Sequence, residues 1–442
     1  MVHRYGRRSN GTVAGMLLCS GMPYYRSVFA ENKLTAFWQK GCYIMIKEEI
    51  KKIWRPGIIA VLILTGAVFY AMFLNFYVQY FPNGPQMDGL MRTAEQWAEE
   101  YGTSLSPDEA AKAKAAYPKL IAEADRYTAS NSLFKEHGVN SYDEFKEFYN
   151  KAVYNVSGQI GADEQKLYSD ASIMLNYLQS EETKNIDGRI YALDTYTQMY
   201  DNWLSALQAA EYDKKELSNA NKLLSDGVLW QNMLPNEITD TASRYFSNLL
   251  VWIIVSVCLL ISPLTVRDKM RKMRQLQWSS RHGRKILNTQ FKASVLSAIA
   301  LTTINILLFG PVFLLKIPFV FFDCRMLSFM QGSLPWFNWT LRGWLAVMVL
   351  LSYAAGVSAA SAAFFLSRYS QNLVAMLLKL IPLIIISAII AMKLLVNAFY
   401  YSSPLYKISG IPGIEAIVPC SALILGAALC MAACKKEKKK EI

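Results

Sequence analysis

The chain has 442 residues, of which 53% are hydrophobic and 18% charged, and its mean hydropathy is +0.17. This composition is too apolar for an ordinary soluble protein. A net charge of +12 is typical of proteins that bind nucleic acid, but here the bases gather at 47–55, 267–292 and 435–440, beside long apolar runs. The charge therefore excludes a nucleic-acid partner and favours a membrane protein.

Residues 1–44 open with a basic cluster followed by a short apolar stretch, as a signal peptide does. Cleavage of such a signal would export the basic segment 47–55, whereas short segments rich in Lys and Arg stay in the cytoplasm. We therefore expect 1–44 to be a disordered or wrongly assigned extension, with the working protein beginning at Met45.

The segment that follows Met45 has the pattern of a short amphipathic helix, which Pro56 ends before the first apolar run. Lysines and glutamates, Glu49 among them, form the opposite face. Such a helix is expected to lie in the membrane interface. The residues of its apolar face are Ile46, Ile50, Ile53 and Trp54.

Six apolar runs are each long enough to cross the ~30 Å hydrocarbon core of a bilayer as a helix. They are roughly 57–80, 246–265, 293–315, 344–366, 373–396 and 413–433. The sequence therefore predicts an all-α integral membrane protein with six transmembrane helices. The first lies in 45–80, the other five lie in 246–434, and 435–442 is a basic tail.

The long insert 81–245 between the first two spans is predicted to be a separate helical domain. It contains 26 acidic and 15 basic residues, a net charge of −11, while the rest of the chain carries +23. Two S-x-x-E segments, 106–109 and 141–144, are typical of helix starts, and apolar residues recur at helical spacing. None of the seven cysteines lies in the insert, so the domain must be held by its own core.

The distribution of bases also predicts the topology of the chain in the cytoplasmic (plasma) membrane. Short loops rich in Lys and Arg stay inside, whereas long domains are translocated regardless of charge. With six spans, both termini and the loop 266–292 would be cytoplasmic, and 81–245 would be extracellular.

Three ionisable residues lie within or beside the predicted spans: Lys379, Lys393 and Glu415. Both lysines are close enough to a span end to extend their ammonium groups to the interface, and Glu415 would face the outer water. A role in substrate binding or coupling is the alternative, because ionisable residues in spans are often functional.

No catalytic or metal-binding motif is present. The three histidines form no H-E-x-x-H arrangement, and no phosphate-binding G-x-x-x-x-G-K-[ST] or nucleophile G-x-S-x-G segment occurs. The sequence thus predicts a protein that is not an enzyme and has no cofactor of its own.

The loop 266–292 contains apolar residues among its bases. Bases alone would be enough to keep the loop on the cytoplasmic side, so the apolar residues need another explanation. Its segment "RDKMRKMRQLQWSSRHGRKILNTQFKAS" resembles the first cytoplasmic loop of type-2 ABC exporter permeases with a large extracellular insert. The order of amphipathic elbow helix, span, insert, span, loop and four spans is similar to that family across 45–442. The matching residues include Lys292, and the resemblance implies ATPase coupling through Asp268, Leu276, Gln277, Trp278, Ser279, Ser280, Gly283, Arg284 and Lys285.

The resemblance implies a permease subunit that couples ATP hydrolysis to the export of an amphipathic substrate. ATP and Mg²⁺ would bind to a separate ABC ATP-binding subunit, and a second permease chain, identical or related, would complete the pathway across the lipid bilayer. The alternative is a receptor or scaffold without transport, whose outer helical domain binds a ligand or partner.

Overall fold

The computed structural model describes residues 45–154, 162–225, 231–273 and 286–439. Within these residues the chain is helical and forms no strand beyond isolated bridges. Six helices are long and apolar enough to cross a membrane, as the sequence predicts, so the protein is an all-α integral membrane protein. Their ranges are Pro56–Gln79, Asn236–Met270, Ile286–Leu314, Leu341–Arg368, Leu373–Leu394 and Ile414–Lys436.

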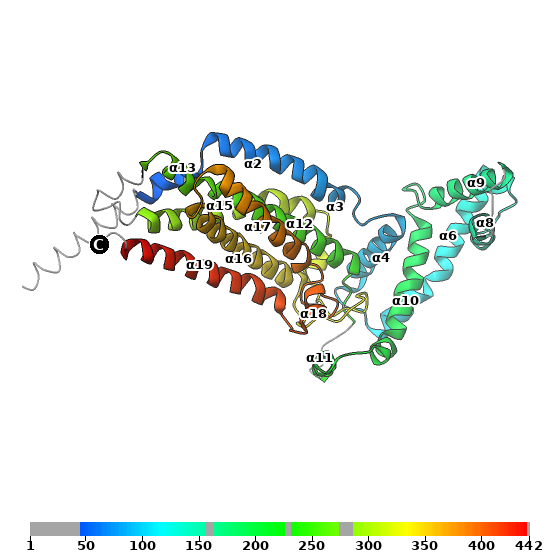
Figure 1. Cartoon of the computed structure of the whole chain (residues 1–442). Helices are drawn as coiled ribbons and strands as arrows, with labels where there is room; N and C mark the ends of the chain where they lie inside the picture. The colour runs from blue at the N-terminus through cyan, green and yellow to red at the C-terminus, as the bar shows by residue number, and fades with distance from the viewer. Residues whose placement is uncertain (1–44, 155–161, 226–230, 274–285, 440–442) are drawn as a thin grey trace, which may run out of the picture.

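The six spans form one bundle, and the insert projects from one of its ends (Figure 1). The first span is continuous through a π-helical turn, and the second changes from α12 to α13 at Pro263. The elements of the bundle are α2 (Pro56–Phe69), η1 (Tyr70–Leu74), α3 (Asn75–Gln79), α12 (Asn236–Ile261), α13 (Pro263–Met270), α15 (Ile286–Leu314), η3 (Phe319–Asp323), α16 (Leu341–Arg368), α17 (Leu373–Leu394), α18 (Pro404–Ser409) and α19 (Ile414–Lys439).

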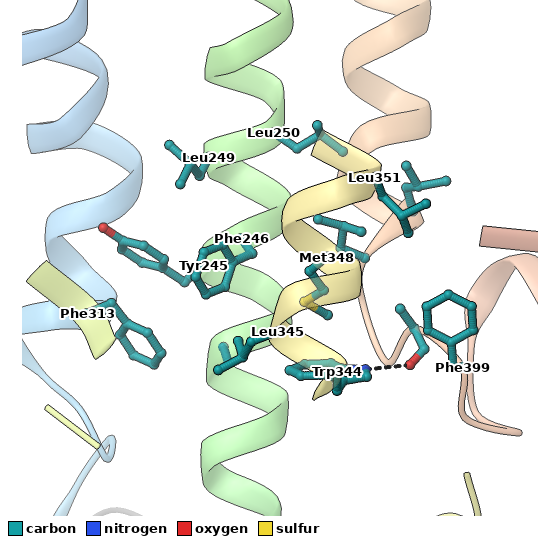
Figure 2. Close-up of a cluster of buried hydrophobic side chains, with 14 of the residues drawn as sticks. Tyr245, Phe246, Leu249, Leu250, Phe313, Trp344, Leu345, Met348, Leu351 and Phe399 are labelled. Carbon is teal, nitrogen blue, oxygen red and sulfur yellow. Dashed lines mark hydrogen bonds between the residues drawn. The ribbon is translucent and has the colours of Figure 1, made fainter. Parts of the chain in front are cut away.

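Helix α12 lies at the centre of the bundle, where it packs against α2, α15, α16 and α17. In the most apolar stretch of the second span, 83% of the residues are buried inside the protein. In the corresponding stretch of α17 only 11% are buried, and the outer face of α17 is apolar and exposed. Figure 2 shows Tyr245 and Phe246 of α12 beside Phe313 of α15 and Trp344 of α16. Exposed apolar faces on the outer helices are what a lipid environment requires.

Small residues and side-chain amides hold the spans together. A Cβ atom on Gly356 of α16 would lie 2.5 Å from Thr302 Oγ1 of α15, so the two helices approach closely. In the same region Trp252 of α12 donates its indole N–H to Asn305 Oδ1 at 3.0 Å, and Asn305 donates to Ser256 Oγ at 3.1 Å. Helices in membranes associate through such small-residue contacts and interhelical hydrogen bonds.

The insert is helical, as the sequence predicts. Its first S-x-x-E segment forms a capping box, in which the Ser106 and Glu109 side chains each bond the other's backbone N–H. At the second, Ser141 accepts from Glu144 N, but the Glu144 carboxylate accepts from Asn140 N instead of Ser141 N. The helices are α4 (Pro85–Tyr101), α5 (Pro107–Ala115), α6 (Tyr117–Ser130), α7 (Ser132–Glu136), α8 (Tyr142–Tyr154), α9 (Ala162–Leu178), α10 (Ile186–Ala209) and α11 (Lys214–Ser225).

The insert does not have a single core of its own. Its base, formed by α4 and α10, shares one hydrophobic core with the bundle, whereas its tip, formed largely by α6 to α9, has a separate core around Phe134 and Phe145. The segment 324–334 lies between base and bundle, and Phe329 contacts Tyr196 and Tyr200 edge-on. The expectation that the insert buries its core independently is therefore wrong for its base, because its apolar stripe continues onto the bundle.

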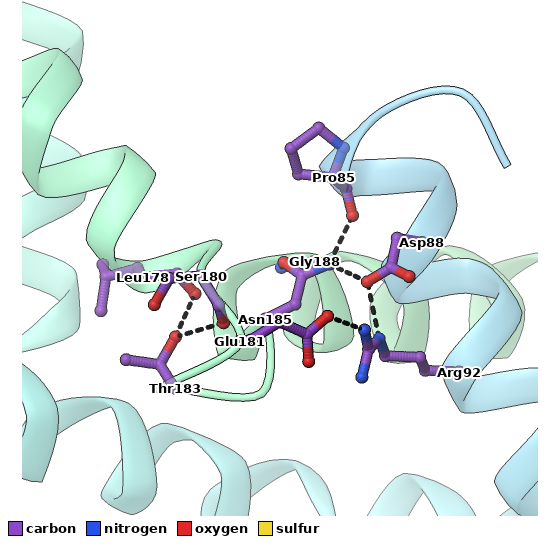
Figure 3. A network of polar contacts seen from close by, with 9 residues as sticks. All are labelled: Pro85, Asp88, Arg92, Leu178, Ser180, Glu181, Thr183, Asn185 and Gly188. Atoms are coloured by element: carbon purple, nitrogen blue, oxygen red, sulfur yellow. Dashed lines mark hydrogen bonds and ion pairs between the residues drawn. The ribbon is translucent and has the colours of Figure 1, made fainter. Parts of the chain in front are cut away.

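Asn185 joins the starts of α4 and α10. Its backbone is left-handed, with φ at 51°, and its side chain caps α10 by accepting from Gly188 N. The same amide donates to Pro85 O at 2.6 Å and to Asp88 Oδ2 at 2.8 Å, and Asp88 also accepts from Arg92 (Figure 3). One polar side chain thus sets the register of α4 and α10, the two helices that form the base of the insert.

Candidate functional site at the basic end of the bundle

One end of the bundle brings together the segments that the sequence marks as basic. Helix 45–53, α13, the first turn of α15 and the last turns of α16 and α19 lie at this basic end, opposite the insert (Figure 1). The loop 274–285 connects α13 to α15 here. Its residues Leu276, Gln277, Trp278, Ser279, Ser280, Gly283, Arg284 and Lys285 lie outside the described residues, so of the predicted coupling residues only Asp268 is placed.

Helix 45–53 rests on the bundle through the apolar face that its sequence indicates. Ile53 is buried, and Ile46, Ile50 and Trp54 are partly buried against the main core. Glu49 belongs to this face too, since only 2% of its surface is exposed, which corrects its expected place on the polar face. Residues three or four positions apart share one side of a helix, so 46, 49, 50 and 53 point the same way.

The buried carboxylate of Glu49 has two partners. Lys52, one turn later, forms an ion pair with it, and Gln290 Nε2 donates to its Oε2 at 3.1 Å. On the exposed side of the same helix, the hydrogen bond from Lys51 lowers the pKa of Glu48 below its ordinary value. A buried carboxylate without such partners would be costly, so Gln290 and Lys52 make the burial of Glu49 tolerable.

Gln290 connects helix 45–53 to both sides of the loop 274–285. It lies in the second turn of α15, just after the loop, and its Nε2 also donates to Asp268 Oδ2 at 2.7 Å. Asp268 lies in α13, just before the loop. One amide group thus joins three segments: the N-terminal helix, the end of the second span and the start of the third.

Helix α13 is also tied to the end of α16. Thr265 Oγ1 and Ser367 Oγ share a buried hydrogen bond of 2.6 Å, and Lys269 Nζ donates to Ser370 O at 3.1 Å. Four parts of the chain are therefore linked at the basic end by polar contacts across helices. A displacement of α13 would move helix 45–53 and α16 with it.

The three ionisable residues of the spans lie apart from one another. Lys379 Nζ donates to Tyr369 O at 3.0 Å near the basic end, and Lys393 is exposed in the last turn of α17. Glu415 is fully buried at the insert end, where it accepts from Ser403 Oγ. Among the residues that the structure describes, its Oε2 has no hydrogen-bond partner. The expectation that Glu415 faces outer water is wrong, because the 395–413 loop folds over it.

Sequence reasoning missed Gln290 and the burial of Glu49. A lone amide at the start of an apolar run was the available signal, since Gln and Asn in spans commonly bond across helices.

Within the described parts of the chain, no three His, Cys, Asp or Glu side chains are grouped in a way that could hold a metal ion. No protein-family model, curated protein or solved structure matches the chain.

Proposed function

We propose that this protein is the membrane-spanning permease subunit of an ATP-driven exporter. Separate ATP-binding subunits would hold ATP and Mg²⁺ and act on the loop 266–292. The observation that carries the proposal is the bridge from Gln290 to Glu49 and Asp268. Because this bridge ties both sides of the loop to helix 45–53, a partner that moves the loop would move the first three spans together.

The proposed orientation places the basic end in the cytoplasm and the insert outside the cell, in agreement with the positive-inside rule. A second permease chain would complete the translocation pathway, and an amphipathic substrate fits the apolar spans. Work is transmitted only if the ATP-binding partner contacts the loop differently in its two nucleotide states. The loop offers both apolar and basic side chains for such contacts.

Co-purification from native membranes tests the proposal. The wild-type chain should retain an ATP-binding protein, and Leu276→Asp or Trp278→Ala should lose that partner together with transport, while membrane insertion is unchanged. Tyr168→Ala is the matched control, because Tyr168 is exposed on α9 in the insert. If both loop variants keep the partner and transport normally, the loop is only a topological anchor.

Absence of any ATP-binding partner from the wild-type preparation would instead favour the receptor or scaffold. The tip of the insert is the surface that such a protein would present, because it has its own core and extends furthest from the bundle (Figure 1).

A further inference from the structure

We propose that the basic end holds a specific binding site for an anionic phospholipid, formed by Arg55, Arg267 and Arg271. These three arginines line one open pocket of about 870 Å³ between the first span, the end of the second and the start of the fifth. Glu49, Asp268 and Gln290 do not line this pocket, and the site does not depend on the proposed transport function.

The charges of the pocket are all of one sign. Among the residues that the structure describes, none of the three arginines has an ion-pair partner, and the positive charges of Arg55 and Arg271 act on Arg267. The nearby carboxylates are bonded elsewhere: Glu48 to Lys51, Glu49 to Lys52 and Gln290, and Asp268 to Gln290. Three unpaired guanidinium groups around one pocket repel each other, and a bound anion would relieve that repulsion.

Guanidinium groups favour a phosphate as that anion. Their planar N–H groups match the oxygens of a phosphate in pairs, and they are more weakly hydrated than the ammonium group of lysine. Arg55 and Arg267 are partly buried, which strengthens an ionic contact relative to one in open water.

The remaining walls of the pocket are apolar and continue toward the middle of the bilayer. Ile58 and Val61 of α2 line it together with Leu259 of α12. Val61 lies six residues beyond Arg55, about 9 Å deeper along a helix, and it is half exposed on the outer surface. A membrane phospholipid matches this arrangement, because its phosphate would lie at the level of the arginines and its acyl chain would run along these apolar residues. Free phosphate would make no contact with the apolar wall.

Native mass spectrometry of the purified full-length chain tests the site. Phosphatidylglycerol should be retained at least tenfold more strongly than phosphatidylcholine with the same acyl chains, and Arg55→Gln combined with Arg267→Gln should abolish that preference. Lys47→Gln should keep it, because Lys47 is an exposed base at the same end that does not line the pocket. Arg271→Gln, an exposed position that folding tolerates more readily, should weaken retention severalfold. Arg267→Lys should weaken retention less than Arg267→Gln does, because lysine keeps the charge but loses the paired N–H groups.

Three outcomes would overturn the proposal. Equal retention of both lipids by the wild type would mean that only the apolar wall binds. Unchanged preference in the double variant would place the lipid elsewhere. Thermal stabilisation by inorganic phosphate equal to that by phosphatidylglycerol would indicate a free-anion site. All these measurements use the isolated chain, so they are separate from any loss of an ATP-binding partner.

Discussion

The side chain of Gln290 donates a 3.1 Å hydrogen bond to the buried carboxylate of Glu49, 241 residues earlier in the chain. The same nitrogen donates to Asp268, so the contact spans the two sides of the loop 274–285 and the N-terminal helix. Without this bridge, helix 45–53 would contact the bundle mainly through its apolar face, which resists sliding less than a directional hydrogen bond does.

Replacing Gln290 with leucine should destabilise the protein and uncouple helix 45–53 from the loop. Glu49 would keep Lys52 but lose its second partner, and the partly buried Asp268 would lose a donor. Loss of the donor to a buried acceptor costs about 1–3 kcal/mol. Thermal unfolding in detergent measures the stability, and nucleotide-dependent cross-linking between helix 45–53 and α13 measures the coupling. Gln198→Leu is the control, because the Gln198 side chain bonds Asp194 on an exposed helix face. Equal melting temperatures for both variants would contradict the role of the bridge.

Gly89→Ala should disrupt the base of the insert. A Cβ atom at Gly89 would lie 2.2 Å from the backbone of Gly188, so α4 and α10 would have to separate. Overpacking of this kind typically costs about 1–3 kcal/mol. Limited proteolysis of the insert should become faster, whereas Gly332→Ala, which meets open space, should resemble the wild type. Resistance to protease equal to that of the wild type would mean that the two helices do not pack at this distance.

The contact between α11 and α18 should weaken in acid. A hydrogen bond from the Tyr406 hydroxyl holds the pKa of Asp213 below its ordinary value, and Lys407 pairs with Glu216 at 3.2 Å in the same contact. A carboxyl whose pKa is lower in the folded state stabilises that state above its unfolded pKa, near 4, and this contribution is lost as the pH falls through the folded pKa. Hydrogen-exchange protection of α11, corrected for intrinsic rates, should therefore fall below about pH 4.

Tyr406→Phe provides the matched comparison for this titration. Without the phenol donor the pKa of Asp213 in the folded protein should return toward its ordinary value. The difference between the folded and unfolded pKa then becomes smaller, so protection should be lower at neutral pH and should fall less on acidification. An identical pH profile in the variant would show that another group controls the contact.

Cysteine labelling in intact cells should place the two ends of the bundle on opposite sides of the membrane. In a cysteine-free background, Lys119→Cys on α6 should react with an impermeant maleimide, and Lys272→Cys should react only after the membrane is opened. Both lysines are exposed, so access to the reagent decides the result. Labelling of Lys272→Cys in intact cells would reverse the proposed orientation.

The sequence alone determined the class of the protein and the apolar part of each of its six spans. Apolar runs longer than a bilayer is thick have one stable arrangement, the transmembrane helix, so all six were predictable. The Ser106 capping box was predictable for a similar reason, because it depends on residues three positions apart. Ile53 and its neighbours were assigned to the correct face because helical spacing is a local property.

Only the tertiary structure decided which distant residues meet. The second span begins at Asn236, earlier than its apolar run at 246. Its first turns are largely buried, and Thr239 there donates to Gln331 of the segment 324–334 at 3.0 Å. The sequence places Glu49 and Glu415 in contact with solvent, yet both are buried in the structure. Gln290 bonds Glu49 from 241 residues away, and Ser403 bonds Glu415 from the segment that precedes the last span. Arg55, Arg267 and Arg271 are unremarkable bases along the chain, and they form one pocket only when the first two spans pack together. Periodicity reports which face of a helix is apolar, whereas these contacts depend on how separate helices are placed against each other.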